Sequence, residues 1–120
     1  MLTYAVDSVR KRIDVQIGGT TSGAEIQTGI RSMLDDPTFD PAYPMLIDLH
    51  AVEQTPTIPE LREIALIVRA NAISSARRAI VSEQLLYYGL AVLFAILTEG
   101  AATRYRAFRS RDEAEAWLSV

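Results

Sequence analysis

Two side chains that could do acid–base chemistry, Asp48 and His50, lie two residues apart in a short apolar segment. Residues at i and i+2 of a β-strand point to one face, so this carboxylate and imidazole could meet a substrate together. The carboxyl end of such a strand is where α/β sheets bind ligands. A hydrolase would also need a nucleophile beside the histidine, and the sequence has no G-x-S-x-G elbow. We therefore expect no catalytic residue, with Asp48 binding loop amides and His50 on the surface.

A third candidate, Thr57, lies between two prolines in the stretch QTPTIPE. Thr57 and Glu60 have the S/T-x-x-E spacing of a capping box, and Pro59 fits the first turn of a helix. A phosphate on a hydroxyl at a helix N-terminus would also be electrostatically tolerated. The spacing is therefore compatible with a helix cap and with a regulatory phosphorylation site.

The stretch IGGTTSGAE is rich in glycine and lies between an expected strand and an expected helix, the setting of many anion sites. It has neither the lysine nor the spacing of a P-loop. Ser22 and Glu25 have capping-box spacing. A tight turn followed by a helix cap therefore explains this stretch.

Arginines gather around the last expected strand. Arg104, Arg106 and Arg109 form a candidate anion-binding edge, which Arg77, Arg78 and Arg111 could extend toward an acidic partner. Charged side chains also protect an edge strand from pairing with another sheet, and we favour this second interpretation.

The composition narrows the class of protein. The chain has 120 residues, net charge −3 and no cysteine, so we expect one domain over residues 1–120 without a disulfide or thiolate site. An acidic chain is not typical of nucleic-acid binding. The longest uncharged apolar run, Leu85–Leu97, is shorter than the roughly 20 residues of a membrane span. We expect a cytoplasmic protein with no metal, no cofactor and no transmembrane segment.

The periodicity predicts an α/β fold whose elements follow in the order β-β-α-β-α-β-α-β-α. Expected strands are Leu2–Val6, Arg12–Ile17, Met45–Leu49, Arg77–Ser82 and Thr103–Phe108. Expected helices run from the Ser22 cap to Asp35, over Ile58–Ile73 with Ala72 on the buried face, over Gln84–Glu99 with Gly100 as C-cap, and over Arg111–Leu118. Strands separated by helices indicate a mostly parallel sheet, to which the first hairpin adds one antiparallel strand.

The third expected helix is apolar on all sides, whereas a helix on a sheet needs one apolar stripe. Leu86, Leu90, Leu93 and Leu97 can form that stripe, and Tyr87, Tyr88 and Phe94 extend the apolar surface beyond it. Three things could cover this additional apolar surface: a second copy of the chain, an apolar ligand under the helix, or neighbouring loops.

The segments MLDDPTFDPAYPMLIDLHAV, ARRAIVSEQLLYYGLAVLF and YRAFRSRDEAEAWL, in this order, resemble the SpoIIAA-like proteins, relatives of the STAS domain (sulfate transporter and anti-sigma factor antagonist). The resemblance covers almost the full length. It implies an α/β sandwich with one helix-covered sheet, and kinship with the CRAL-TRIO lipid-binding fold.

The resemblance also implies a regulatory role. STAS-type antagonists bind a kinase-like partner and are inactivated by phosphorylation of a serine after the central strand, a position that Thr57 occupies here. Pro56 and Pro59 replace the acid and the glycine around that serine, so we interpret Thr57 as a cap at a vestigial switch position. We expect a non-enzymatic STAS-like interaction module that forms a homodimer and could also bind another regulatory protein. The alternative is a carrier of a small apolar or lipid-like ligand.

Overall fold

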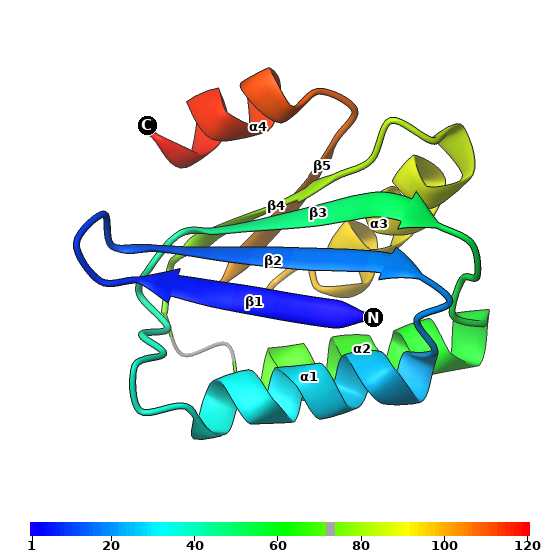
Figure 1. Cartoon of the computed structure of the whole chain (residues 1–120), viewed down its shortest axis with the longest axis horizontal. Coiled ribbons are helices and arrows are strands. Elements are labelled where there is room, and N and C mark those ends of the chain that lie inside the picture. The colour runs from blue at the N-terminus through cyan, green and yellow to red at the C-terminus, as the bar shows by residue number, and fades with distance from the viewer. Residues whose placement is uncertain (72–73) are drawn as a thin grey trace.

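The computed structural model describes residues 1–71 and 74–120, and within them it has a five-stranded sheet in the order β1-β2-β3-β4-β5 (Figure 1). The first strand is antiparallel to the second, and all other neighbours are parallel. The strands are β1 (Leu2–Asp7), β2 (Arg12–Gly19), β3 (Met45–Val52), β4 (Arg77–Val81) and β5 (Arg104–Phe108). The predicted α/β fold, with its N-terminal hairpin and its order of elements, is confirmed.

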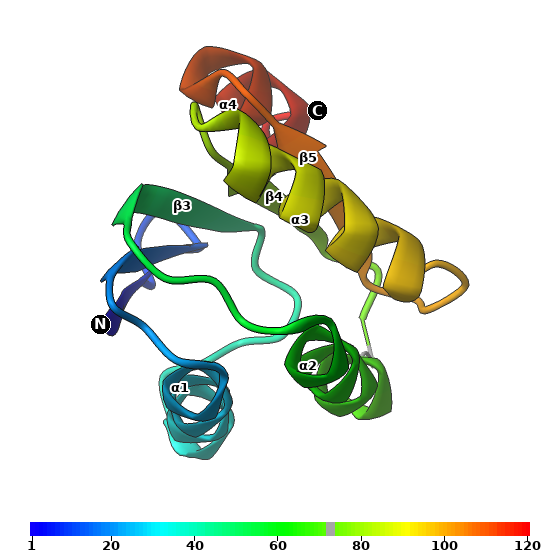
Figure 2. The ribbon, with the colours of Figure 1, turned by 90° about the vertical axis from the view of Figure 1, so that its right-hand side faces the viewer.

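Three helices cover one face of the sheet and the fourth covers the other (Figures 1 and 2). The parallel strands are added in one direction, so right-handed crossovers carry the first three helices to the same side. They are α1 (Gly23–Asp35), α2 (Ile58–Ala70) and α3 (Leu85–Leu97), and α4 is Arg111–Leu118. The predicted extension of α2 to Ile73 and the buried position of Ala72 fall on residues outside the described part.

The side chains of each strand alternate between these two layers. In β4, Ile80 packs against α2 and α3, whereas Ala79 and Val81 join the cluster under α4. In β3, Leu46 faces α4 and Ile47 faces the three-helix side. This period-2 alternation determines which residues can reach the space beneath the three helices.

The buried side of α3 differs from the predicted stripe. Leu86 is 66 % exposed, and Ala91 and Phe94 are the buried residues of this helix. The helix also ends earlier than predicted: Thr98 is its C-cap, and Gly100 lies two residues beyond with a φ of 85°. An apolar residue at nearly every position gives no periodicity from which to choose the buried side.

A β-bulge interrupts the pairing of β2 with β3. Ile17 pairs with Leu49 and Gly19 with Val52, so Gly18 lies opposite two residues, of which Ala51 has a φ of 49°. An added Cβ at Gly18 would lie 2.6 Å from the backbone oxygen of His50. The bulge therefore requires glycine at position 18.

We expect Gly18→Ala to lower the free energy of unfolding by about 1–3 kcal/mol, because the new methyl group meets backbone that cannot rotate away. Urea unfolding measures this change. Gly89→Ala is the matched control: Gly89 is in an exposed part of α3 with no heavy atom within 4 Å of an added Cβ, so it should stabilise the protein by about 0.5–1 kcal/mol. Equal effects of the two substitutions would contradict the bulge geometry.

An ion-pair cluster joins α4 to the sheet. Arg12 of β2 donates from both terminal nitrogens to the Glu115 carboxylate, with Nη2 2.7 Å from Oε1, and Nη2 also contacts Asp14 at 3.1 Å. The hydrogen bond from Arg12 is the main cause that holds the pKa of Glu115 below its ordinary value of 4.5. Breaking this pair leaves Asp14 as the remaining carboxylate partner of the Arg12 side chain, which is 11 % exposed.

We expect Glu115→Gln to cost about 1–2 kcal/mol at neutral pH, a modest figure for a charged hydrogen bond because water screens the partly exposed carboxylate. Since folding lowers the pKa of Glu115, its charged form stabilises the fold above pH 4.5, and this contribution is lost as the pH falls through the folded pKa. The difference between wild type and variant in urea unfolding should therefore shrink in acid. A difference that stays constant with pH would contradict the ion pair's role.

Candidate functional site

An apolar cavity of about 150 Å³ lies between the sheet and the three helices on its face. Its walls come from strands β2, β3 and β4, from α1 and from the facing sides of α2 and α3. Ile47, Ile80, Leu61, Ile64 and Phe94 are typical of its lining. Side chains of this kind bind apolar molecules and do not by themselves catalyse a reaction.

The two ends of the cavity differ in charge. At the carboxyl end of β3 it is bordered by the loop residues Gln54–Pro56 and by Tyr87 of α3. Toward the amino end of β4 the lining includes Arg78, Tyr105 and Asn71. The strand register places Arg78 level with Met45 and Tyr105, so neighbouring strands build the end that carries the charge.

Helix α3 divides the predicted apolar patch between the cavity and the surface. Tyr87, Leu90 and Phe94 line the cavity, and the Phe94 ring packs edge-on against Tyr105 with centroids 5.2 Å apart. The other members of the patch do not line it. Leu93 and Leu97 are half-buried against the core, Tyr88 is half-buried, and Leu86 is exposed.

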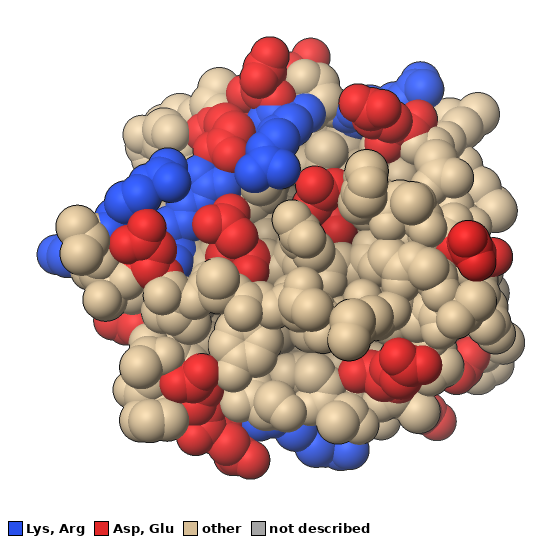
Figure 3. Space-filling view, in the orientation of Figure 1, with Lys and Arg blue, Asp and Glu red and all other residues tan. Residues whose placement is uncertain are grey.

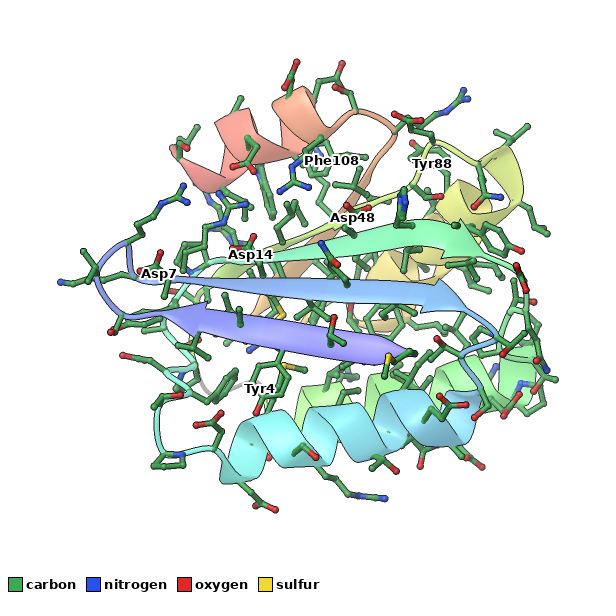
Figure 4. All side chains as sticks on the ribbon, viewed as in Figure 1. Tyr4, Asp7, Asp14, Asp48, Tyr88 and Phe108 are labelled. Carbon is green, nitrogen blue, oxygen red and sulfur yellow. The ribbon has the colours of Figure 1, made fainter. Side chains whose placement is uncertain are left out.

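Asp48 and His50 do not converge on this cavity. Asp48 lies on the side of β3 that faces α4, where its Oδ2 accepts from Arg111 at 3.3 Å (Figure 4). His50 is exposed at the bulge. The predicted contact of Asp48 with loop amides is therefore replaced by an ion pair, and neither residue lines the space where a substrate could bind.

Thr57 is the N-cap of α2. Its Oγ1 accepts from the N–H of Glu60 at 3.3 Å, and its own N–H donates to Glu60 Oε1 at 2.8 Å. The latter bond is the main cause that lowers the pKa of Glu60 below its ordinary value of 4.5, with a further contribution from the Thr57 side chain. The same reciprocal pattern joins Ser22 and Glu25 at the start of α1. These contacts fix the starts of two helices that cover the cavity.

The arginines of the predicted anion-binding edge differ in their contacts. Arg104, Arg106 and Arg109 are exposed, and the guanidinium of Arg106 lies 5.2 Å from the Phe108 ring on the α4 side. Arg77 donates to the carbonyl oxygen of Trp117 at 2.9 Å, near the end of α4. Figure 3 shows basic side chains in a band from the β1–β2 turn toward α4, interspersed with acidic ones.

The grouping of Arg78 with this edge was wrong. Arg78 points to the opposite face of the sheet, lines the cavity and is 8 % exposed. The buried position of Arg78 could have been inferred from the sequence, because in RRAIVS Arg78 and Ile80 alternate with Ala79 and Val81. A strand that is apolar on both sides places any arginine within it in a buried layer.

In residues 1–71 and 74–120, no group of three or more metal-ligating side chains comes together. Within that same part, no helix has the length and apolar character to cross a membrane.

The chain matches no protein-family model and no curated protein. Its structure is similar to that of an uncharacterised DUF3478-family protein from Shewanella loihica PV-4, which has a SpoIIAA-like fold. The TM-score is 0.62 over 98 % of this chain and 93 % of that one, at 14 % sequence identity. The protein therefore has a SpoIIAA-like fold, as the resemblance in its sequence predicted.

Proposed function

We propose that the protein is a non-enzymatic cytoplasmic binding protein that carries a small apolar molecule in the cavity beneath α1, α2 and α3. The observation that carries this proposal is an apolar space of about 150 Å³ inside a chain of only 120 residues. Native cores have few voids larger than a water molecule. A space of this size is therefore a better candidate for a ligand site than for a packing defect.

The volume restricts the ligand. An engineered apolar cavity of about 150 Å³ in another protein binds benzene or xenon, whereas sites for drug-sized molecules span roughly 300–1,000 Å³. A ligand with a body the size of one aromatic ring therefore fits the cavity as it stands. A complete lipid would require the helices to separate from the sheet.

A titration with toluene, followed by ¹H–¹⁵N NMR, tests the carrier proposal. We expect saturable shift changes confined to residues around the cavity, among them Leu61, Ile80 and Ala91. Ala91 is 4 % exposed and lines the cavity, so Ala91→Leu fills the space and should weaken toluene binding at least tenfold.

Ala95→Leu is the matched control, because Ala95 is on the same helix and does not line the cavity. It should leave toluene affinity unchanged. Shift changes scattered over the surface, or equal affinity in wild type and Ala91→Leu, would contradict the proposal.

A second candidate is self-association through the outer side of α3. Leu85, Leu86 and Ile96 are 69 %, 66 % and 54 % exposed, and α3 has no charged residue with which to solvate this side. A second copy of the chain, or another regulatory protein, would bury these side chains.

Sedimentation velocity at micromolar concentration tests this interaction, with Ile96→Asp as the variant. We expect a wild-type dimer that the buried charge converts into a folded monomer. Ile96 is a sharper probe than Leu93, which packs partly against the core. A wild type that sediments as a monomer rules out the homodimer.

For Thr57 we propose a capping role without a working phospho-switch, because both its backbone and its side chain are engaged by Glu60. Intact-mass measurement of protein from its native cells should show unmodified Thr57. Stoichiometric phosphorylation there would overturn this interpretation.

A further inference from the structure

Among the described residues that line the apolar cavity, one is a buried cation, Arg78, at one end. Arg78 lies near the start of β4 on the three-helix side, and only 8 % of the residue is exposed. The two strands beside it place Met45 and Tyr105 at the same level. The position is therefore fixed by the sheet.

The guanidinium of Arg78 has an incomplete set of partners. Its Nη1 donates to the hydroxyl oxygen of Tyr105 at 2.6 Å. Its Nε is buried and has no hydrogen-bond partner among the described residues. The ion pairs in that part of the chain involve Arg12 and Arg111, and none of them includes Arg78.

The Arg78 guanidinium is matched only by the hydroxyl and the ring face of Tyr105, whose centroid lies 5.5 Å from Cζ, so it lacks a counter-charge, which is an unfavourable arrangement for a buried cation. A ligand that carried one negative charge into the cavity would supply the missing counter-charge. The Nε edge of a guanidinium has two nearly parallel N–H bonds, which match the two oxygens of a carboxylate. Among the described residues, the rest of the lining is mainly apolar and includes no second cation for a doubly charged group.

We propose that the cavity binds a small apolar monocarboxylate, of which benzoate is the size standard, with its carboxylate on Arg78 and its apolar body among Ile47, Ile80 and Phe94. This inference rests on the carrier function proposed above and names its ligand class. Tyr105 acts as a positioning residue, because its hydroxyl holds Nη1 and its ring packs against Phe94.

Calorimetric titration of the full chain with benzoate and with benzyl alcohol tests the charge preference. The two probes have the same ring, and only benzoate is charged. We expect benzoate to bind about tenfold to hundredfold more tightly, the range for a hydrogen bond to a charged group. If benzyl alcohol binds in the cavity as tightly as benzoate, the carrier proposal stands and the carboxylate proposal is wrong. If neither probe binds, both the carrier proposal and the carboxylate proposal are wrong.

Arg78→Met should remove this preference and leave benzyl alcohol affinity within about threefold. Arg106→Met is the matched control: it removes the same charge from an exposed position on the other face, and should keep the preference for benzoate. An equal loss in both variants would mean that net charge, and not Arg78, attracts the anion.

If the methionine variant does not fold, Arg78→Lys tests whether the carboxylate binds Arg78. Lysine retains the charge without the two-donor edge. The benzoate affinity of Arg78→Lys should therefore be lower than that of the wild type and of Arg106→Met. It should still be higher than the affinity for benzyl alcohol. A lysine variant that binds benzoate no better than benzyl alcohol, while wild type discriminates, still assigns the carboxylate to Arg78. Full wild-type discrimination in Arg78→Met would refute the assignment.

Discussion

Phe94→Ala is expected to lower the free energy of unfolding by about 3–5 kcal/mol, the range for removing a buried aromatic side chain. Phe94 is 8 % exposed and packs edge-on against Tyr105, so its ring joins α3 to β5. Its removal would also enlarge the cavity that the ring lines, which adds a cavity cost to the lost transfer free energy. Urea or thermal unfolding followed by circular dichroism measures the loss.

Leu86→Ala on the same helix is the control for this prediction. Because Leu86 is 66 % exposed, its truncation should change stability by no more than about 0.5 kcal/mol. Similar losses at Phe94 and Leu86 would show that α3 is rotated about its axis relative to the structure described here.

Leu46→Ala is expected to cost about 2–5 kcal/mol, because Leu46 is only 1 % exposed and its removal leaves a new void under α4. The side chain packs with Ala79, Phe108 and Ala114 on the face of the sheet opposite the cavity. Its loss should therefore reduce stability to nearly the same extent as Phe94→Ala without changing the affinity for toluene.

The two core variants together separate stability from binding. Below the unfolding transition, Phe94→Ala should change toluene affinity because the ring lines the cavity, whereas Leu46→Ala should retain the wild-type value. A parallel change in both variants would mean that ligand affinity follows global stability and does not report on a specific site.

The order of the elements could be predicted because local patterns determine it. Ile13, Val15 and Ile17 alternate with polar residues in β2, and Arg111–Leu118 is the helix in both the prediction and the structure. Capping-box spacing located the starts of α1 and α2 at Ser22 and Thr57. These signals act over a few residues and need no tertiary information.

The cavity could not be predicted, because its volume depends on how closely three helices approach the sheet. The same apolar residues, packed slightly closer, would fill the space. Helix α3 shows the limit most clearly: Leu86 and Phe94 are equally apolar in the sequence, and only the tertiary arrangement exposes the first and buries the second. The prediction for Arg78 was wrong for a related reason. Arg77 and Arg78 are adjacent in the sequence and were predicted to lie on one basic edge, but their side chains lie on opposite faces of the sheet.

The carrier proposal requires an apolar space between the sheet and its three covering helices that a small molecule can occupy. A crystal structure determined under xenon pressure tests it most directly, because xenon enters apolar cavities of this volume. We predict a xenon site bounded by Ile80, Leu61 and Phe94, with Arg78 at the far end of the same cavity. A fully packed core with no xenon between the sheet and α1, α2 and α3 would rule out this site.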